Sequence, residues 1–507
     1  MELKQLCEKV LDIFEIKEIS ALSDKLFKVV TANDTSRYND FKSLVEDMSI
    51  DWIQKIFQYY EADRKEKKQD YTPKTIAKLT ATLTQSDGSV VYDICAGSGA
   101  LTIQKWALSP NKFFICEELD SKVIPYLLFN MAIRNMNGYV INRNVLTGET
   151  FKVYKLEKGT DFSIVSEVSE VPEISADEII SNPPYNIKWD APQPLLADER
   201  FINCPIPPES NANYAFIFTA IARMKRGGKC AFILPCGCLS SSIEKECRKY
   251  LIDNGLIQKI ILLPNKMFES TSIPTFICFL TNDNKSVEMY DCRQKGEQEQ
   301  RAQNGQFGGA SHTNRTYYKT VNIIPDALID TLCSECESTP EFSEKVDIRQ
   351  IVGNDYELIP SRYIKFIEKE EQHRNYQEIA DNINFITKMR NSCKLVINET
   401  IAKSLKLDIE QFKKDKQASI NIQKEMKALG IDLDVEDYIQ FTKNKNEFVF
   451  KCNDREIIPE MLMQMFAVWK NQIALLNSME NKYLAELRDA LLPELMSGKL
   501  DVNNVDL

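Results

Sequence analysis

Histidine is almost absent from this sequence. Its 507 residues contain only two histidines, His312 and His373. This scarcity argues against a reaction that needs a histidine base and against a metal centre built on imidazole. The fourteen cysteines are scattered, and several lie within apolar stretches, where a free cysteine behaves as a small hydrophobic residue. One C-x-x-C and one C-x-C pair occur, neither with a second pair nearby, so we predict no metal site and no disulfide framework.

Long apolar runs are also missing. No run approaches the roughly 20 residues that a membrane-spanning helix needs. Glu2, Lys4, Glu8 and Lys9 interrupt the first apolar positions, which is not the pattern of a secretory leader. We therefore expect a cytoplasmic protein that does not associate with a membrane.

The chain lacks an excess of positive charge. Its net charge of −11 argues against a protein that binds nucleic acid without a partner. A local basic groove or a separate subunit remains compatible with this charge. The run RKEKK at 64–68, followed by Lys74 and Lys78, is the candidate for such a groove, although a solvated helix face explains the run equally well.

The length indicates two or three domains. Apolar residues at helical spacing predict a helical N-terminal domain over 1–65, with a polar break at 31–40. From residue 90 onwards, short apolar runs alternate with helical stretches, which predicts an α/β fold with a doubly wound sheet of about seven strands. The predicted strands are 90–94, 112–117, 139–142, 177–181, 229–235, 258–263 and 274–281. The predicted helices are 100–108, 121–136, 213–225 and 241–253.

A glycine turn joins the first of these strands to the following helix. Asp93 lies near the end of the strand, and Gly97, Ser98 and Gly99 form the turn. A strand, a glycine turn and a helix in this order allow the backbone to approach a nucleoside ligand closely. We therefore expect these residues to bind such a cofactor.

Polar residues end the next two strands. The second strand ends in Glu117 and Glu118, and an acidic residue at this position can accept hydrogen bonds from ribose hydroxyls. Because side chains alternate along a strand, only one of the two glutamates can face the ligand. The third strand runs into Asn142, Arg143 and Asn144, and we expect a polar residue here to face the base of the cofactor.

The most distinctive stretch follows the fourth strand and reads Asn182-Pro183-Pro184-Tyr185. A strand that ends in Asn-Pro-Pro-aromatic places a rigid polar loop at the carboxyl edge of the sheet, where α/β proteins bind ligands. Asn182 can donate and accept hydrogen bonds, and Tyr185 offers a flat ring for stacking. This combination suits a planar ligand with an exocyclic amino group. An ordinary Asn-Pro turn without chemistry is the alternative.

A helix start precedes the glycine turn. In Tyr71-Thr72-Pro73 we expect Thr72 to cap the helix and Pro73 to occupy its first turn. The N-terminus of this helix can hold a carboxylate, such as that of a cofactor that carries an amino acid.

These motifs, in this order, resemble the gamma class of N6-adenine DNA methyltransferases, and more closely the modification subunit of type I restriction-modification systems. The similarity covers roughly residues 50–363 and includes NDYELIPSRY at 354–363. Two positions depart from the family pattern, since Ile94 stands where the family has proline and Asn144 where it usually has aspartate.

The resemblance implies a Rossmann-like methyltransferase domain over 66–363 that transfers a methyl group from S-adenosylmethionine to adenine N6 in double-stranded DNA. It selects Glu118 for the ribose and assigns the cofactor's remaining contacts to the motifs around Tyr71, Asp93 and Asn144. The Asn182 side chain and the Pro183 carbonyl would accept the two N–H bonds of the adenine amine, with Tyr185 stacked on a base that has left the duplex. No covalent intermediate and no metal are implied.

Two other functions share part of this pattern. A protein glutamine N5-methyltransferase also carries Asn-Pro-Pro-Tyr, but the Tyr-Thr-Pro motif and the long helical tail argue against it. A non-catalytic subunit for DNA binding and assembly is the third interpretation.

Beyond residue 363 the pattern becomes helical, which predicts a C-terminal domain over 364–507. Two apolar seams, from Tyr376 to Ile397 and from Phe466 to Ala490, can pair with each other or with another subunit. The tail LLPELMSGKL at 491–500 is similar to a helix end typical of type I specificity subunits. We therefore expect docking on a separate specificity subunit through these helices, with a restriction subunit as a possible further partner.

Two polar loops interrupt the predicted sheet. The proline-rich loop 191–213 is a candidate for DNA contact, whereas we expect 293–316 to be simply flexible.

Overall fold

The chain divides into two units, Met1–Ile367 and Glu368–Leu507. The computed structural model describes residues 3–54, 56, 72–189, 198, 200–268, 273–304, 316–366, 376–404, 439–441, 448–450 and 474–496. Tyr71, the basic run 64–68 and residues 190–197 of the first polar loop lie outside the described residues, so their predicted roles stay predictions.

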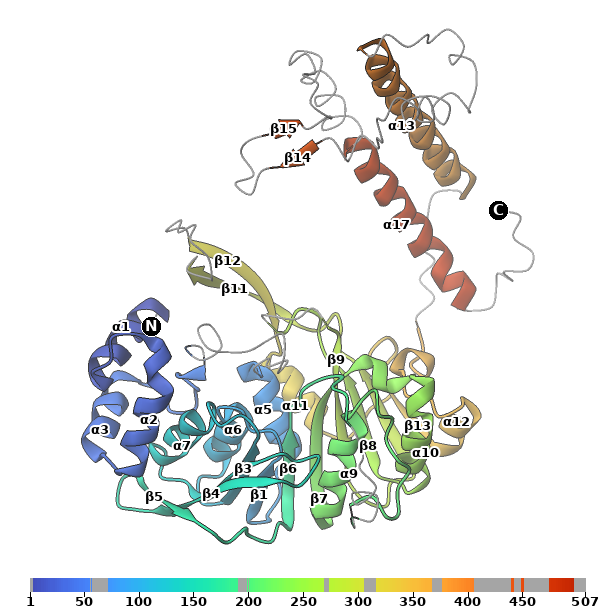
Figure 1. Cartoon of the computed structure of the whole chain (residues 1–507). Coiled ribbons are helices and arrows are strands. Elements are labelled where there is room, and N and C mark those ends of the chain that lie inside the picture. Colours follow the sequence, from blue (N-terminus) through green and yellow to red (C-terminus); the bar gives the residue numbers. More distant parts are fainter. Residues whose placement is uncertain are drawn as a thin grey trace. The chain divides into compact units, whose positions relative to one another are not determined.

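An eleven-stranded sheet forms the centre of the first unit (Figure 1). Its strands are β1 Val90–Asp93, β2 Phe113–Glu118, β3 Asn137–Arg143, β4 Thr150–Lys158, β5 Ser163–Val168, β6 Ala176–Ser181, β7 Met224–Pro235, β8 Ile257–Leu262, β9 Thr275–Leu280, β10 Ser286–Asp291 and β13 Ser343–Asp347. Their order is β13-β10-β8-β9-β7-β6-β1-β2-β3-β4-β5. Five adjacent strands in the middle of the sheet are parallel to one another, namely β7, β6, β1, β2 and β3. Strand β9 runs antiparallel between β7 and β8.

All seven predicted strands are present, and β4, β5, β10 and β13 enlarge the sheet. These four strands were not predicted, because they lack the uninterrupted apolar runs that are typical of strands buried on both faces. Strand β4 instead reads TFKVYKLEK, and β5 at the edge of the sheet alternates buried and exposed side chains in its first half. One face of such a strand meets water, so its pattern contains charged residues.

Helices cover both faces of the sheet. On one face lie α5 Lys74–Leu83, α6 Ala100–Leu108, α7 Ile124–Ala132 and α11 Asp326–Cys333; on the other lie α9 Asn213–Arg223, α10 Lys245–Asp253 and α12 Ile348–Gly353. Successive strand residues supply the two layers in turn, as Val91 packs in the first and Tyr92 in the second. The doubly wound prediction is therefore confirmed, with α7 shorter than the predicted 121–136.

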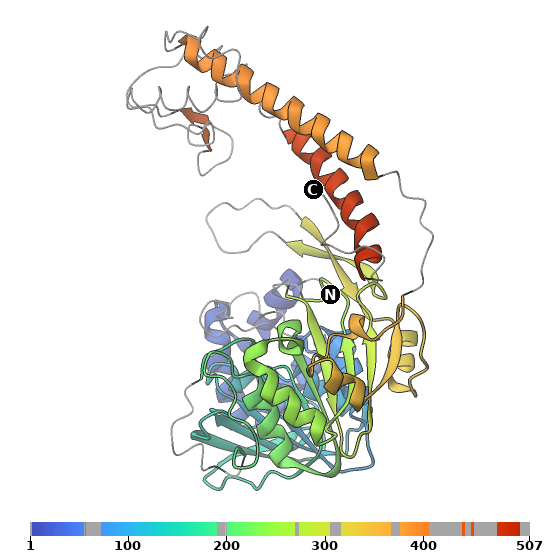
Figure 2. The same cartoon turned by 90° about the vertical axis from the view of Figure 1, so that its right-hand side faces the viewer.

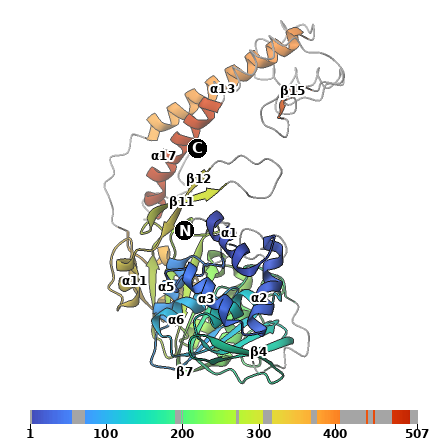
Figure 3. The same ribbon diagram turned by 90° about the vertical axis from the view of Figure 1, so that its left-hand side faces the viewer.

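Three N-terminal helices extend the first layer. They are α1 Leu3–Phe14, α2 Leu22–Thr31 and α3 Thr35–Leu44, and Figure 3 shows them on the side of α5 and α6. Phe14 and Phe41 meet Phe129 of α7 edge-on, at 5.5 and 5.1 Å between ring centres. The predicted polar break at 31–40 is wrong, because α3 begins at residue 35 and the Asp34 side chain caps it by accepting from the amides of residues 36 and 37.

The second polar loop is also more ordered than predicted. Residues Glu297–Asn304 form β11, which pairs antiparallel with β12, Thr316–Ile323. The expectation of simple flexibility over 293–316 is therefore wrong for 297–304, and 305–315 lie outside the described residues. Backbone hydrogen bonds hold a two-stranded ladder of this kind, so an apolar run is not needed to form it.

Two helices dominate the second unit. Helix α13, Tyr376–Ser404, and helix α17, Ala474–Met496, lie side by side in Figures 1 and 2. Strand β14, Ile439–Phe441, pairs antiparallel with β15, Phe448–Phe450. The helices are antiparallel, since Tyr376 bonds the Ala490 carbonyl (3.5 Å) and Thr387 bonds Glu480 (3.3 Å). Glu480, the polar exception in its seam, also pairs with Arg390. Residues 466–473 of the second seam lie outside the described residues; for the described parts, pairing within the chain is the one of the two alternatives that is observed. Among the described helices, none is both long and apolar enough to span a membrane.

Candidate active site

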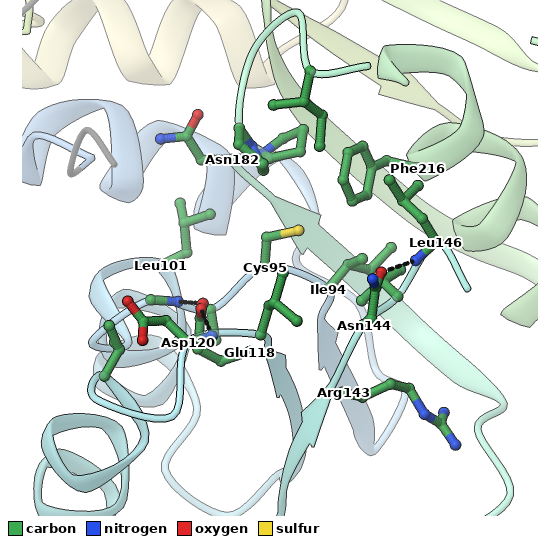
Figure 4. Close-up of a pocket in the computed structure, with 18 of the residues that line it drawn as sticks. Ile94, Cys95, Leu101, Glu118, Asp120, Arg143, Asn144, Leu146, Asn182 and Phe216 are labelled. Carbon is green, nitrogen blue, oxygen red and sulfur yellow. Dashed lines mark hydrogen bonds between the residues drawn. The ribbon is translucent and has the colours of Figure 1, made fainter. Parts of the chain in front are cut away.

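A cavity of about 450 Å³ opens at the carboxyl ends of β1, β2, β3 and β6. This is the edge at which doubly wound sheets bind ligands, and the volume is within the range of small-molecule sites. Its lining includes eight of the predicted site residues: Thr72, Gly97, Glu118, Asn144, Asn182, Pro183, Pro184 and Tyr185. Figure 4 shows Asn182 and Glu118 on opposite sides of this space, with Cys95 between them. The glycine turn and the Asn-Pro-Pro-Tyr loop therefore share one cavity.

The glycine turn brings bare backbone to the cavity wall. Gly97 and Gly99 have φ angles of +56° and +101°, which residues other than glycine rarely adopt. A Cβ atom on Gly99 would also lie 3.0 Å from a methyl group of Leu127, so α7 and the turn are packed closely. Helix α6 begins directly afterwards, and the amide of Gly97 donates to a Glu118 carboxylate oxygen at 2.9 Å.

The two glutamates that end β2 point to opposite faces of the sheet. Glu117 is fully buried, where it accepts a hydrogen bond from Tyr92 (2.7 Å) and pairs with Arg223 (3.0 Å). Glu118 faces the cavity, and its second carboxylate oxygen accepts from the Asp120 amide at 2.8 Å. Burial raises the pKa of Glu118, while the two backbone donors act in the opposite direction. The structure therefore places Glu118, and not Glu117, in the lining of the cavity.

Two side-chain hydrogen bonds hold the asparagine of the Asn-Pro-Pro-Tyr loop in place. The Asn182 Nδ2 group donates to Thr72 Oγ1 at 2.9 Å, and the Tyr185 hydroxyl donates to Asn182 Oδ1 at 2.7 Å. Thr72 does not cap α5 as predicted, because the N-cap residue is Pro73 and the cap has no side-chain hydrogen bond. Its hydroxyl instead links the start of α5 to the loop after β6.

Four predicted cofactor residues, Pro73, Asp93, Ser98 and Gly99, are outside the cavity lining. Asp93 is fully buried and accepts from the Thr102 hydroxyl at 2.7 Å, and the Ser98 hydroxyl donates to Asp51 at 2.6 Å. These side chains therefore stabilise the region of the glycine turn from outside the cavity. Asn144 lines the cavity, but its Oδ1 accepts from the Leu146 amide at 3.1 Å and so stabilises its own turn (Figure 4).

Several lining residues were missed by the sequence interpretation. Leu119 follows Glu118 directly and is 55% exposed, so an apolar residue after the acidic strand end was the signal for it. Phe216 comes from α9 and had no signal, because its approach to Leu146 depends on how α9 packs on the sheet (Figure 4). Asn142 is outside the lining; its Nδ2 donates to the carbonyls of Glu118 and Leu119, both at 2.9 Å, and fixes the strand end. No cluster of metal ligands occurs in the described part of the chain.

Asp93 makes the stability of the protein depend on pH. Burial raises the pKa of Asp93 from an ordinary value of 3.8 to about 7. The folded protein therefore keeps a proton that the unfolded chain releases, and the stability contributed by this proton falls as the pH rises from about 4 to about 7, by about 1.4 kcal/mol per pH unit at most. In Asp93→Asn this loss is absent. The melting temperature of the variant, relative to that of the wild type, is expected to increase from pH 5 to pH 8.

Asp87→Asn, at an exposed position before β1, is the matched control and should show a constant difference across this range. A constant difference for Asp93→Asn as well would show that Asp93 is ionised in the folded protein throughout.

The family model for N-6 DNA methylases matches residues 47–372, and the chain belongs to this family. The class that the fold and the site define is thus an N6-adenine DNA methyltransferase, which confirms the predicted resemblance. Among curated relatives, the methylase subunit of the type I restriction enzyme MpnII from Mycoplasma pneumoniae is 25% identical over 419 residues, covering 80% of this chain and 73% of the relative. The methylase subunit of HindI from Haemophilus influenzae is 27% identical over 375 residues, covering 70% and 75%.

A solved type I methyltransferase subunit from Streptococcus thermophilus is 21% identical to this chain and aligns with a TM-score of 0.47, covering 71% of this chain and 80% of that one. The family match and the two curated relatives relate the protein to the modification subunits of type I restriction-modification systems, as the sequence predicted.

Proposed function

We propose that the chain uses S-adenosylmethionine to methylate N6 of an adenine that has left the DNA duplex. The observation that carries this proposal is the single cavity that Glu118 and the glycine turn share with the Asn-Pro-Pro-Tyr loop. A donor and an acceptor bound at the two ends of one cavity are brought together without crossing bulk water, which favours group transfer by proximity.

The cofactor side of the cavity fits the proposed ligand. Glu118 presents a half-buried carboxylate for ribose hydroxyls, and Gly97 leaves the backbone accessible because it has no side chain. Leu119 and Phe216 provide apolar surfaces for a base. S-Adenosylmethionine supplies an electrophilic methyl group on its sulfonium. The chain's own residues bind and orient the cofactor. Thr72 and the start of α5 lie on the side of the cavity that the Asn-Pro-Pro-Tyr loop forms.

The other side fits an aromatic amine. The lone pair of adenine N6 is delocalised into the ring, so the amine is a weak nucleophile. Asn182 Oδ1 and the Pro183 carbonyl would accept its two N–H bonds and localise this lone pair. Tyr185 is only 9% exposed and lines the cavity, so a base would enter a slot that already exists. Base flipping costs a few kcal/mol, and aromatic stacking is worth roughly 1–3 kcal/mol per base.

We also propose that the chain works with a specificity subunit, and in a restriction system with a restriction subunit, on double-stranded DNA in the cytoplasm. A net charge of −11 supports this proposal, because a partner would have to contribute much of the positive surface for DNA. The paired helices α13 and α17 leave Phe385, Met389 and Leu475 exposed by 62%, 42% and 56%. Apolar side chains of this size on one helical pair are suited to a further helix from a partner.

Transfer of a labelled methyl group from S-adenosylmethionine tests the proposal. We expect the complex purified through a tag on this chain to label unmodified host DNA at adenine N6, and calorimetry to show binding of the cofactor. Label on protein glutamine instead of DNA would refute the proposal in favour of a protein methyltransferase. Absence of both transfer and cofactor binding would indicate an assembly subunit.

A further inference from the structure

The Asn182 amide lies between two hydroxyl groups, and one of these contacts uses the atom that a bound base would need. Tyr185 donates to Oδ1 at 2.7 Å, which is the atom proposed to accept from adenine N6. The amine has to displace this hydroxyl or share the oxygen with it. Thr72 instead accepts from Nδ2 at 2.9 Å, on the opposite end of the amide, so this contact can persist while the base is bound.

The orientation of the amide decides whether Asn182 can act. The two ends of an asparagine amide are similar in size but opposite in polarity, since Oδ1 accepts and Nδ2 donates. Rotation by half a turn about the terminal torsion, which is a soft torsion, would present a donor to the adenine amine, itself a donor. The hydrogen bond in which Thr72 accepts from Nδ2 stabilises the orientation that leaves Oδ1 for the base, and rotation breaks this bond. Thr72 is 6% exposed, so water has little access to replace its hydroxyl.

The backbone of Thr72 is in turn held by a segment that precedes the Tyr-Thr-Pro motif and contains Asp51 and Gln54. Gln54 Nε2 donates to the Thr72 carbonyl at 3.4 Å, and the Gln54 amide donates to Asp51 at 2.9 Å. Asp51 also receives the Ser98 hydroxyl at 2.6 Å, which ties the same segment to the glycine turn. The backbone of Thr72 is thus positioned with respect to both halves of the cavity.

We infer that Thr72 is a positioning residue for methyl transfer, whose hydroxyl holds the Asn182 amide with Oδ1 directed at the base. This inference rests on the proposed function. It differs from the sequence prediction, in which Thr72 caps α5 and binds the cofactor, because it assigns the hydroxyl to the catalytic amide.

The test uses the tagged complex and three variants. Thr72→Val keeps the shape and removes the hydroxyl, Thr72→Ser keeps the hydroxyl, and Thr82→Val makes the same chemical change further along α5, where the hydroxyl bonds the Lys78 carbonyl. We measure the single-turnover rate at saturating S-adenosylmethionine and, by calorimetry, the dissociation constant of the cofactor. Thr72→Val is expected to lower the rate about tenfold or more, the effect of losing one hydrogen bond. Its cofactor affinity should change less than threefold, and Thr72→Ser and Thr82→Val should stay within threefold of the wild type in both measurements.

A double substitution separates positioning from general damage. If Thr72 acts through Asn182, Thr72→Val should add less than a twofold effect to the residual rate of Asn182→Ala. The inference is overturned if Thr72→Val leaves the rate unchanged, or if it weakens cofactor binding tenfold without changing the saturated rate. It is equally overturned if Thr72→Ser is as slow as Thr72→Val, a comparison that remains valid if the valine variant folds poorly. A wild-type complex that does not methylate DNA would instead refute the proposed function.

Discussion

Asn182→Ala is expected to reduce methyl transfer to DNA by about 10²- to 10³-fold or more, because a preorganised hydrogen-bond partner of the reacting group is removed. The dissociation constant of S-adenosylmethionine should stay nearly unchanged. Asn182 contacts Thr72 and Tyr185 and lies across the cavity from Glu118, so its side chain is not needed to hold the ribose (Figure 4). Single-turnover transfer and calorimetry on the same preparation measure both quantities.

Asn254→Ala provides the matched control for this experiment. Asn254 is exposed at the end of α10, and its amide donates to the Tyr250 carbonyl at 2.8 Å. We expect transfer and cofactor binding by this variant to equal those of the wild type. Wild-type transfer by Asn182→Ala would mean that Asn182 has no part in activating the amine.

Glu118→Ala is expected to weaken the binding of S-adenosylmethionine by about 100-fold, which corresponds to the loss of one or two hydrogen bonds to a charged group. The carboxylate also accepts from the amides of Gly97 and Asp120, so its removal takes away one of the links between the glycine turn and β2. Glu118→Gln keeps one acceptor oxygen and should show a smaller loss, about tenfold. Calorimetric titration with the cofactor gives all three dissociation constants.

Glu149→Ala is a suitable comparison, since Glu149 is exposed in the turn between β3 and β4 and does not line the cavity. Its cofactor affinity should match that of the wild type. If Glu118→Ala binds the cofactor as tightly as Glu149→Ala does, the ribose is not held by this carboxylate. Transfer at saturating cofactor would then distinguish a role in catalysis from no role.

The main strands were predictable because each contains an apolar run. β9, for example, reads TFICFL and is buried throughout, so only one local structure fits it. β4 and β5 were not predictable in this way. An antiparallel strand that faces water on one side carries charged residues between its apolar ones, and such a sequence resembles that of a loop. The N-terminal helix α3 was missed for a related reason, since most of its residues are polar and only Tyr38 and Phe41 are buried.

The site shows the same division. Gly97, Glu118 and Asn182 each follow a recognisable strand, so their meeting at one edge of the sheet follows from the topology of parallel strands. The partner of Asn182 does not follow from it. Thr72 lies 110 residues earlier in the chain, and nothing in its own neighbourhood indicates a bond to the loop after β6.

The sequence by itself determined seven of the strands, the glycine turn and the Asn-Pro-Pro-Tyr loop, because each depends on the conformational preferences of a few neighbouring residues. Only the tertiary structure decided that Thr72 holds the Asn182 amide, that Asp51 holds Ser98, and that α9 brings Phe216 to the cavity. These contacts join segments that are far apart along the chain. Their geometry depends on how helices pack against the two faces of the sheet, and no local pattern encodes it.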